Sequence, residues 1–322
     1  MSFVKYKEKK FEVKDGKLEI YKCKGLKINE IKGLETIKEL QELFIWRCDL
    51  EEIKGLDKLP KLKKLDLSKN QISRIEGLKD ISNLEYLNLS FNQISEIKGL
   101  KNLINLEVLN LNKNKITEIK GLESLVNLNT LFLNQNQISE IKGFGTNKKL
   151  EYLELKNNKI TEISGLDALV NLKLLYLDNN EIIEVKGLDN LINLKELSLY
   201  GNEITDIKGL NNLIQLEKLF LSNNKIKEIK GFDGLKNLRM LELYYNEISE
   251  IENLSHLENL EELYLDGNKI SDIKGLANLR KLQKLSLWEN KIPIEIIDKF
   301  RRLDEHEIIA QKVVEYCREK KN

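Results

Sequence analysis

Residues 84–103 read Leu-Glu-Tyr-Leu-Asn-Leu-Ser-Phe-Asn-Gln-Ile-Ser-Glu-Ile-Lys-Gly-Leu-Lys-Asn-Leu, and this stretch decides the fold because it recurs along most of the chain. Its central asparagine returns every 22 residues, at positions 70, 92, 114, 136, 158, 180, 202, 224, 246, 268 and 290. Counting back in the same register places repeat starts at Leu62, Leu40 and Leu18. A fixed period of this length is typical of a solenoid, in which each repeat forms one coil that stacks on the next.

Each part of the repeat predicts one part of the coil. Around Leu87 and Leu89 the hydrophobic period is two, which indicates a short strand with its leucines inward and the intervening residues outward. Stacked repeats are expected to pair these strands into one parallel sheet on the concave side. The segment from Ser95 to Leu103 is too short for a regular helix, so we expect one or two turns of α-helix or 3₁₀ helix on the convex side.

The asparagine column is interpreted as structural. Each asparagine lies where the chain leaves the sheet and turns inward, and backbone groups buried there need a side chain that both donates and accepts hydrogen bonds. Counting back by 22 places Cys48 in this position in an early repeat and Leu26 in the first one. Repeat six departs from the pattern, because Asn147 replaces a convex-side Leu or Ile, and we expect the core to be locally weak there.

A glycine column marks the convex turn. Glycine with Asn253 as its one substitute indicates a positive φ angle, since asparagine tolerates that backbone conformation best after glycine. None of these glycines belongs to a phosphate-binding motif. The column consists of Gly33, Gly55, Gly77, Gly99, Gly121, Gly143, Gly165, Gly187, Gly209, Gly231 and Gly275.

The fold class predicted from these patterns is an α/β right-handed solenoid (horseshoe) of about 12–13 repeats, forming a single continuous domain. We assign residues 1–17 to an N-terminal cap, 18–292 to the solenoid and 293–322 to a C-terminal helical cap. Alternation on both sides of Asp15-Gly16 predicts a β-hairpin cap. After Pro293, apolar residues at helical spacing predict two short helices that close the other end.

Composition narrows the classes of function. The chain has 53 Lys and Arg against 52 Asp and Glu, so bulk charge gives no reason to expect binding to nucleic acid or to an anionic membrane. No apolar run is long enough to span a membrane, and residues 1–17 do not resemble a secretory signal. Three scattered cysteines are too few for a disulfide framework. We therefore expect a cytoplasmic protein without membrane contact.

Aromatic residues concentrate at the outward strand positions, which lie −6, −4, −2 and −1 from each asparagine. From Tyr176 onward they alternate regularly between the −4 and −2 positions, while the core uses Leu and Ile. One interpretation is that aromatic residues simply favour strands. We favour an interaction surface, because exposed aromatic rows with polar rims mark such surfaces. The aromatic residues at these positions are Phe44, Trp46, Tyr86, Phe91, Phe132, Tyr152, Tyr176, Tyr200, Phe220, Tyr244, Tyr245, Tyr264 and Trp288.

The pattern L-x-x-L-x-L-x-x-N-x-I resembles that of leucine-rich repeats. With I-x-x-I-x-G-L in a 22-residue unit, it is similar to the subfamily typified by the leucine-rich regulatory subunit of protein phosphatase 1, and also to the repeats of secreted bacterial internalins. The phosphatase resemblance implies that aromatic and acidic residues of neighbouring strands grip a phosphatase catalytic subunit. The two candidate rows with this order are Phe132–Glu154–Tyr176 and Phe220–Glu242–Tyr264.

Two features depart from the phosphatase-regulator pattern. Ser286 stands where an acidic residue is expected before Trp288, and the cap motif of that subfamily is not visible after Pro293. The candidate partner-binding residues are Phe44, Trp46, Tyr86, Phe132, Tyr152, Glu154, Tyr176, Tyr200, Phe220, Glu242, Tyr244, Tyr264 and Trp288.

These observations favour a non-catalytic scaffold or regulatory subunit, a monomer that binds a globular protein, with a protein phosphatase as the specific candidate. The alternative is a nucleic-acid- or ribonucleoprotein-associated module, since aromatic rings can stack on bases; acidic residues on the same face argue against it. An enzyme is not expected, because the histidines His256 and His306 lack a nucleophile or acidic partner at motif spacing. No metal-ligand cluster and no cofactor motif are present in the sequence.

Overall fold

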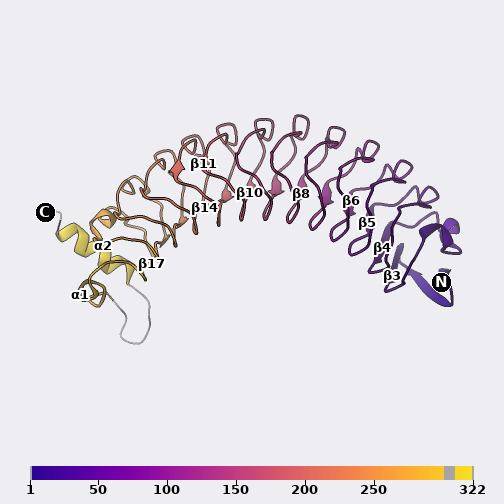
Figure 1. Ribbon diagram of the computed structural model, residues 1–322, viewed down its shortest axis with the longest axis horizontal. Helices are drawn as coiled ribbons and strands as arrows, with labels where there is room; N and C mark the ends of the chain where they lie inside the picture. The colour runs from indigo at the N-terminus through magenta and orange to yellow at the C-terminus, as the bar shows by residue number, and fades with distance from the viewer. Residues whose placement is uncertain (1, 301–308, 321–322) are drawn as a thin grey trace. The chain divides into compact units, whose positions relative to one another are not determined.

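The computed structural model describes residues 2–300 and 309–320, and the chain divides into two compact units, Met1–Lys159 and Ile160–Asn322. Each unit is a stack of coils, with short strands on one side and loops on the other (Figure 1). Strands of successive coils pair in parallel within each unit, which confirms the solenoid and its parallel sheet. We call the two sides the strand side and the loop side.

The first unit begins with three antiparallel strands and continues with parallel ones. β1 pairs with β2 and β2 with β3, and from β3 each strand pairs in parallel with the next. Two 3₁₀ helices, η1 (Ile28–Glu30) and η2 (Leu34–Thr36), lie between β3 and β4. The strands are β1 (Ser2–Tyr6), β2 (Lys9–Lys14), β3 (Lys17–Tyr21), β4 (Glu42–Trp46), β5 (Lys64–Asp66), β6 (Tyr86–Asn88), β7 (Val108–Asn110), β8 (Thr130–Phe132) and β9 (Tyr152–Glu154).

The second unit has six parallel strands in its main sheet and a two-stranded sheet on the loop side. The smaller sheet pairs β11 (Glu184–Val185) with β13 (Asp206–Ile207). A 3₁₀ helix, η3 (Lys274–Leu276), and two α-helices, α1 (Ile294–Ile297) and α2 (Ala310–Glu319), follow towards the C-terminus. The main strands are β10 (Leu174–Tyr176), β12 (Glu196–Ser198), β14 (Lys218–Phe220), β15 (Met240–Glu242), β16 (Glu262–Tyr264) and β17 (Lys284–Ser286).

The core of each unit is built from stacked leucine and isoleucine columns. The strand leucines pair in register with those of the next coil, as Leu197 does with Leu219 and Leu219 with Leu241. All three side chains are fully buried. Burying such a side chain stabilises a fold by about 1.5–3 kcal/mol. Because each coil can bury its apolar side only against its neighbours, the stack is the stable unit.

The asparagine column closes the strand-side corner, as expected. The Asn224 Nδ2 donates to the carbonyl oxygens of Leu199 and Leu221, each at 3.0 Å, and its Oδ1 accepts the Ile204 backbone N–H at 3.0 Å. One side chain therefore satisfies backbone groups of two successive coils. The structural interpretation of this column is confirmed.

The first coil does not follow the 22-residue register. Leu18 pairs with Leu43, so the first coil is three residues longer than the others. As a result Cys23, not Leu26, occupies the asparagine position: its backbone N–H donates to the Cys48 sulfur at 3.3 Å. The assignment of Leu26 to this position, and of Leu18 as the equivalent of Leu40, is wrong. Cys48 does occupy the position, as predicted, and donates its thiol to the Trp46 carbonyl at 3.4 Å.

Backbone shape and close packing both explain the loop-side glycines. Gly99 has a φ of +85°, and an added Cβ would lie 1.8 Å from the Ile75 carbonyl oxygen. Asn253, the substitute in this column, has a φ of +55°, as predicted. Gly275 is the exception, since it lies in η3 without a positive φ; there a Cβ would lie 1.8 Å from the Ile251 carbonyl oxygen. The positive-φ explanation is therefore wrong at Gly275, where space requires the glycine.

Helical turns on the loop side are fewer than one per repeat. Among the described residues, 3₁₀ helices occur only as η1, η2 and η3, and in the remaining coils the loop side consists of turns and extended segments. Asn147 is fully buried there, with Nδ2 donating to the carbonyls of Leu122 and Leu125 at 3.1 and 3.0 Å. Its Oδ1 has no hydrogen-bond partner. The local weakness expected at this residue stays a prediction.

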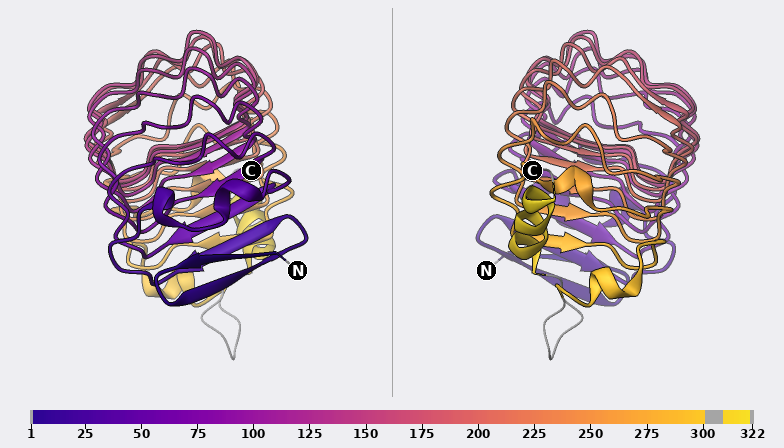
Figure 2. Two further views of the ribbon diagram at one scale, coloured as in Figure 1. Left: turned by 90° about the vertical axis from the view of Figure 1, so that its right-hand side faces the viewer. Right: turned by 90° about the vertical axis from the view of Figure 1, so that its left-hand side faces the viewer.

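The ends of the stack are covered as the sequence indicates. The β2–β3 hairpin is present, and β1 adds a third strand that the sequence did not predict. Figure 2 shows these strands at one end of the first unit and α2 at the C-terminal end of the second. Helix α2 packs on η3: the Cys317 thiol donates to the Ile273 carbonyl at 3.0 Å, and the Arg318 Nε donates to the Ala277 carbonyl at 2.8 Å. Residues 301–308 of the predicted C-terminal cap lie outside the described residues.

Candidate protein-binding surface

The outward strand positions of each unit form what we call the strand face. The alternation that places them there is clear in and after β15, where Leu241 and Leu243 are buried while Glu242 and Tyr244 are half-buried. All thirteen candidate residues lie on the strand face of their own unit, and every one of them is half-buried. Side chains of this kind combine apolar contact area with partial exposure, as binding surfaces require.

One aromatic group of the first unit lies near its N-terminus. The Trp46 ring stacks on Tyr21, with centroids 5.2 Å apart and planes inclined by 14°. Beside it, the Lys17 ammonium lies 4.8 Å from the centroid of Phe44. The sequence prediction missed Tyr21, because the constant 22-residue register put other residues on the first strand. The alternation of Leu18 and Ile20 was the signal that identifies Tyr21 as outward.

A second group of the first unit joins two neighbouring strands. The rings of Phe132 on β8 and Tyr152 on β9 are 5.3 Å apart, and Phe132 is paired with Glu154 in the sheet. Both the Tyr152 hydroxyl and the Asn134 amide donate hydrogen bonds to the Glu154 carboxylate. Tyr86 is in neither group; burial and the nearby Asp66 raise the pKa of its phenol.

The second unit carries the predicted aromatic–acid–aromatic row. Phe220, Glu242 and Tyr264 are register partners on β14, β15 and β16. Neighbouring strands lie ~4.8 Å apart, so these three side chains are adjacent. Tyr176, the last residue of the other predicted row, also lies in this unit, on β10.

A second aromatic contact of this unit bridges two coils. The rings of Tyr200 and Tyr244 are 6.3 Å apart, although one whole coil of the solenoid lies between the coils that carry them. Ser222 occupies the equivalent position in that intervening coil and is fully buried. A small residue there leaves room for the two rings. Trp288 lies further along, with its backbone N–H donating to the Asp266 carboxylate at 2.9 Å.

Two acids of the second unit are held by both a tyrosine and a lysine. Glu196 accepts from the Tyr176 hydroxyl at 2.7 Å and pairs with Lys218 at 3.4 Å. Glu262 accepts from Tyr264 at 2.6 Å and pairs with Lys284 at 3.1 Å. Burial acts to raise the pKa of Glu262, but the hydrogen bonds from Tyr264 and Lys284 outweigh it and lower the pKa. Each of these two carboxylates therefore already has a lysine ammonium beside it within the chain.

Glu242 differs from these two acids. No ion pair joins it to a Lys or Arg among the described residues. Burial raises its pKa, a hydrogen bond with Tyr244 acts against this, and the neighbouring Glu262 raises the pKa further. The phenol pKa of Tyr264 is raised by burial, by its hydrogen bond to Glu262 and by nearby carboxylates. The acid in the centre of the row thus lies among neutral hydroxyls and another acid.

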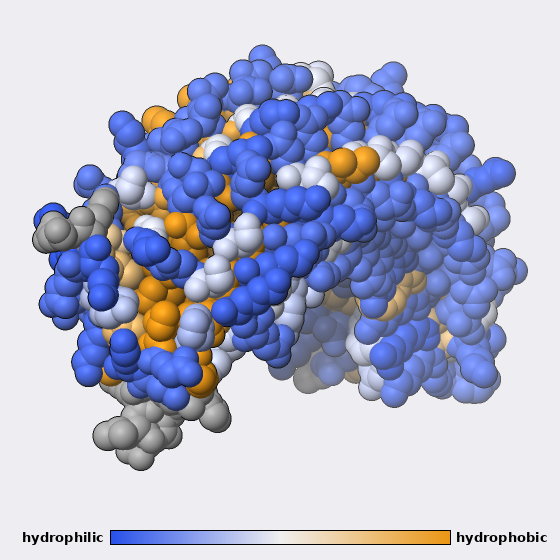
Figure 3. Space-filling model, turned by 60° about the vertical axis from the view of Figure 1, so that its left-hand side comes forward, coloured by the Kyte–Doolittle hydropathy of each residue, from blue (hydrophilic) through white to orange (hydrophobic). Residues whose placement is uncertain are grey.

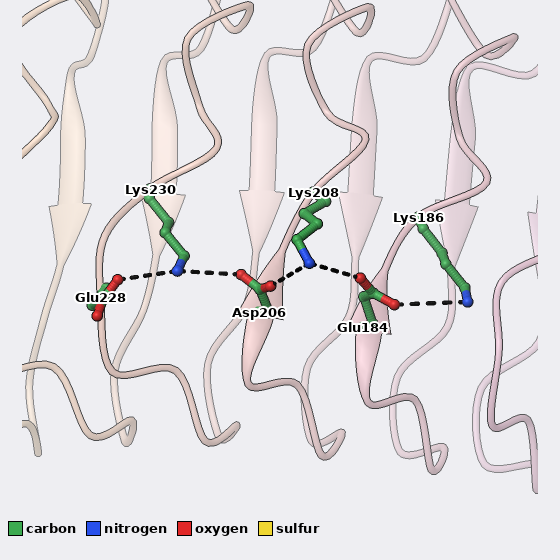
Figure 4. Close-up of polar contacts among 6 residues, drawn as sticks. All are labelled: Glu184, Lys186, Asp206, Lys208, Glu228 and Lys230. Carbon is green, nitrogen blue, oxygen red and sulfur yellow. Dashed lines mark hydrogen bonds and ion pairs between the residues drawn. The ribbon is translucent and has the colours of Figure 1, made fainter.

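On the loop side, by contrast, exposed charges pair with one another. Lys208 lies 2.7 Å from Asp206 and 3.2 Å from Glu184. Lys230 continues the series at 3.4 Å from Asp206 (Figure 4). Acids and lysines of successive coils alternate along this ladder, whose ends in the figure are Lys186 and Glu228. Such exposed pairs contribute little stability each, and they leave no uncompensated charge.

The loop side also exposes a column of aliphatic residues that the sequence prediction did not include. In the second unit these side chains are 41–51% exposed, and they recur at the 22-residue period. Most of the visible surface in Figure 3 is hydrophilic, with apolar residues gathered towards the C-terminal end. The column consists of Ile104 and Val126 in the first unit, and Val170, Ile192 and Ile214 in the second.

Within residues 2–300 and 309–320, no three His, Cys, Asp or Glu side chains are grouped so as to hold a metal ion. The His256 Nε2 lies 2.9 Å from the Phe232 carbonyl oxygen, and His306 lies outside the described residues. In the same part of the chain, no helix has the length and apolar character that crossing a membrane would require.

Comparison with known families identifies repeats along most of the chain. The family described as leucine rich repeat matches residues 38–94, 192–248 and 214–270. The family described as leucine rich repeats (2 copies) matches residues 82–124, 104–146, 126–168, 148–190, 170–212 and 258–301. No curated protein sequence matches the chain.

Solved structures share the fold. An internalin, InlF, from Listeria monocytogenes is 30% identical over 86% of this chain and 82% of its own, with a TM-score of 0.77. The leucine-rich-repeat protein LIC12759 of Leptospira interrogans is 26% identical over 84% of this chain and 83% of its own, with a TM-score of 0.60. TLR13, solved with ssRNA13, is 21% identical over 85% of this chain and 47% of its own, with a TM-score of 0.70, and shows the fold alone. The narrower resemblance to phosphatase regulators stays a prediction.

Proposed function

Because the chain belongs to the leucine-rich-repeat family, whose fold typically serves as a protein–protein interaction module, we propose that it is a non-catalytic scaffold or regulatory subunit that binds a globular protein through its strand face. The observation that carries this proposal is the concentration of half-buried aromatic side chains on that face. Aromatic residues are the anchors of protein interfaces, since they bury large areas at little entropic cost.

The more specific form of the proposal is regulation of a protein phosphatase. Its support is the resemblance of the repeat, together with the adjacent Phe220, Glu242 and Tyr264 in the second unit. A cytoplasmic location is part of the proposal, because Cys23, Cys48 and Cys317 are free, buried thiols, as reducing compartments favour.

The test begins with affinity capture by the wild-type chain and identification of bound proteins by mass spectrometry. A triple variant, Tyr176→Ala, Phe220→Ala and Tyr264→Ala, is then compared with it. We expect the variant to lose capture of the partner by at least about tenfold, because truncating interface anchors costs more than about 1 kcal/mol each. Purified phosphatase 1 catalytic subunit is tested in the same assay.

A matched control truncates exposed apolar residues on the loop side of the same unit: Val170→Ala, Ile192→Ala and Ile214→Ala. This control should bind as the wild type does. If the strand-face variant is folded and still captures the partner, the proposed function is wrong. If only the loop-side variant loses it, the binding surface is the aliphatic column.

A further inference from the structure

The strand faces of the two units carry opposite charge. In the first unit the basic residues outnumber the acidic ones: Lys17, Lys22, Arg47, Lys64, Lys69, Lys113 and Lys156 against Glu19, Glu42, Asp66 and Glu154. In the second the order is reversed: Lys218 and Lys284 against Asp178, Glu196, Glu242, Glu262, Asp266 and Glu289. The near-zero net charge of the whole chain conceals this difference.

The two lysines of the second strand face are already used within the chain. Lys218 pairs with Glu196 and Lys284 with Glu262. When these two ion pairs are set aside, every other charged residue at the outward positions of the second unit is acidic. Charge complementarity between partners steers association and selects against partners of the same charge. The remaining acids therefore favour a cationic partner and disfavour an acidic one.

Glu242 is the best placed of the remaining acids. Phe220 and Tyr264 are its register partners on either side, and Tyr244 follows it two residues later, just after the end of β15. The carboxylate is half-buried and lacks a cation among the described residues. Lys and Arg side chains carry an apolar stem behind a charged head. Such a side chain could lay its stem on the rings and place its head on the carboxylate, with further attraction to the ring faces.

We propose that the strand face of the second unit binds a Lys- or Arg-bearing segment of a protein partner, with Glu242 as the acceptor of the cationic head between Phe220 and Tyr264. This proposal rests on the proposed function and names the chemistry of the partner. Burial raises the pKa of Glu242, and an arriving cation would restore the favourable environment that the carboxylate lacks in the free chain.

The test uses two fluorescein-labelled peptides and the full chain. One peptide contains three arginines separated by glycines, and its twin carries citrulline, a neutral analogue of similar shape, in place of each arginine. Fluorescence anisotropy in about 50 mM salt limits screening. We expect the arginine peptide to bind about tenfold more tightly than its twin, and Glu242→Gln to weaken its binding about five- to tenfold.

The matched control is Glu252→Gln, which neutralises an exposed acid on the loop side of the same unit and should leave the affinity unchanged. Equal binding of the two peptides, equal effects of the two substitutions, or no binding of the arginine peptide would each overturn the proposal. A different result would overturn the proposed function, namely capture of the partner by the folded triple variant that lacks Tyr176, Phe220 and Tyr264. If capture of the partner requires Phe220 but not Glu242, the proposed scaffold function stands and only the proposal of a cationic partner is wrong.

Discussion

The strand side and the loop side of one coil are held by different physical means. At the strand-side corner, a buried asparagine forms several hydrogen bonds with the backbone of two coils. At the loop-side corner of most coils, a glycine allows the backbone to pass close to the previous coil; at Gly99 an added Cβ would clash with the Ile75 carbonyl oxygen. The first corner depends on hydrogen-bonding groups and the second on shape, so substitutions should damage them in different ways.

The strand side and the loop side also differ in how their surface charges are arranged. Loop-side acids and lysines of successive coils pair with one another, as in the ladder of Figure 4. On the strand face of the second unit, Glu242 lacks such a partner among the described residues. The comparison teaches that the ladder charges are compensated within the chain, whereas the charge of Glu242 is left for another molecule to compensate.

The largest effect is expected at the strand-side corner. Asn224→Leu removes the side chain that satisfies the Ile204 N–H and the carbonyls of Leu199 and Leu221. The two carbonyls keep a second amide donor, from Asn202 and Asn246, but the Ile204 N–H is left unsatisfied in the core. Losing this acceptor and the two donated hydrogen bonds should lower the free energy of unfolding by about 3–5 kcal/mol, measured by urea denaturation. The control Asn212→Ala, whose amide bonds the Asp189 carbonyl at an exposed site, should cost less than about 1 kcal/mol. Equal losses would contradict the structural role of the column.

At the loop-side corner the expected effect is smaller. Gly99→Ala places a methyl group against the Ile75 carbonyl oxygen at a positive φ, and we expect a loss of about 2–3 kcal/mol in the same measurement. Gly25→Ala separates the two causes, because Gly25 has a φ of +62° but nothing within 4 Å of an added Cβ. It should cost only about 1 kcal/mol. A Gly99 variant no less stable than the Gly25 variant would show that shape does not limit this corner.

Repeat six gives a prediction of opposite sign. Asn147→Leu removes a fully buried amide whose Oδ1 has no partner, and it restores the residue type found in the neighbouring coils. The carbonyls of Leu122 and Leu125, which accept from Asn147, also accept backbone N–H groups, so they stay satisfied. Stability should therefore rise by about 1–2 kcal/mol. A loss of stability would mean that the coil has adapted its packing to asparagine.

The smallest effects concern the surface charges and should differ in sign. The folded-state pKa of Glu242 is raised, so its ionisation at neutral pH opposes folding; Glu242→Gln should increase stability at pH 7 by less than about 1 kcal/mol. The gain should vanish near pH 3, below the ordinary glutamate pKa of 4.5, where the carboxyl is protonated in both states. Lys208→Met removes two exposed ion pairs and should slightly lower the Tm at pH 7. Thermal denaturation of both variants at the two pH values checks the signs.

Much of the fold could be predicted because the same sequence pattern recurs in almost every coil. The parallel sheet, the asparagine column, the Cys48 position and the β2–β3 hairpin follow from periodicity and local turn chemistry. The first coil could not be predicted in this way, since three extra residues displace Leu26 from the asparagine position and bring Cys23 there. Nor could Gly275, where the pattern is kept for a different physical reason.

The candidate surface was predictable only in outline. Alternation along each strand indicates which residues point outward, and these include all the candidate residues. Which outward groups compensate each other depends on side-chain conformations across several coils. The contact of Tyr200 with Tyr244 has a buried serine between the two tyrosines in the sequence of coils. Glu262 has a lysine partner, whereas Glu242 has none among the described residues. A single repeat contains none of this information.

The asparagine column has a consequence for how such a chain can change over time. Each asparagine binds backbone atoms, which every amino acid possesses, so this corner of the coil does not depend on the identity of the outward side chains. Substitutions on the strand face can then accumulate one at a time, each altering what the surface binds while the scaffold beneath stays the same. A duplicated coil would add another row of outward side chains to the strand face without changing this corner.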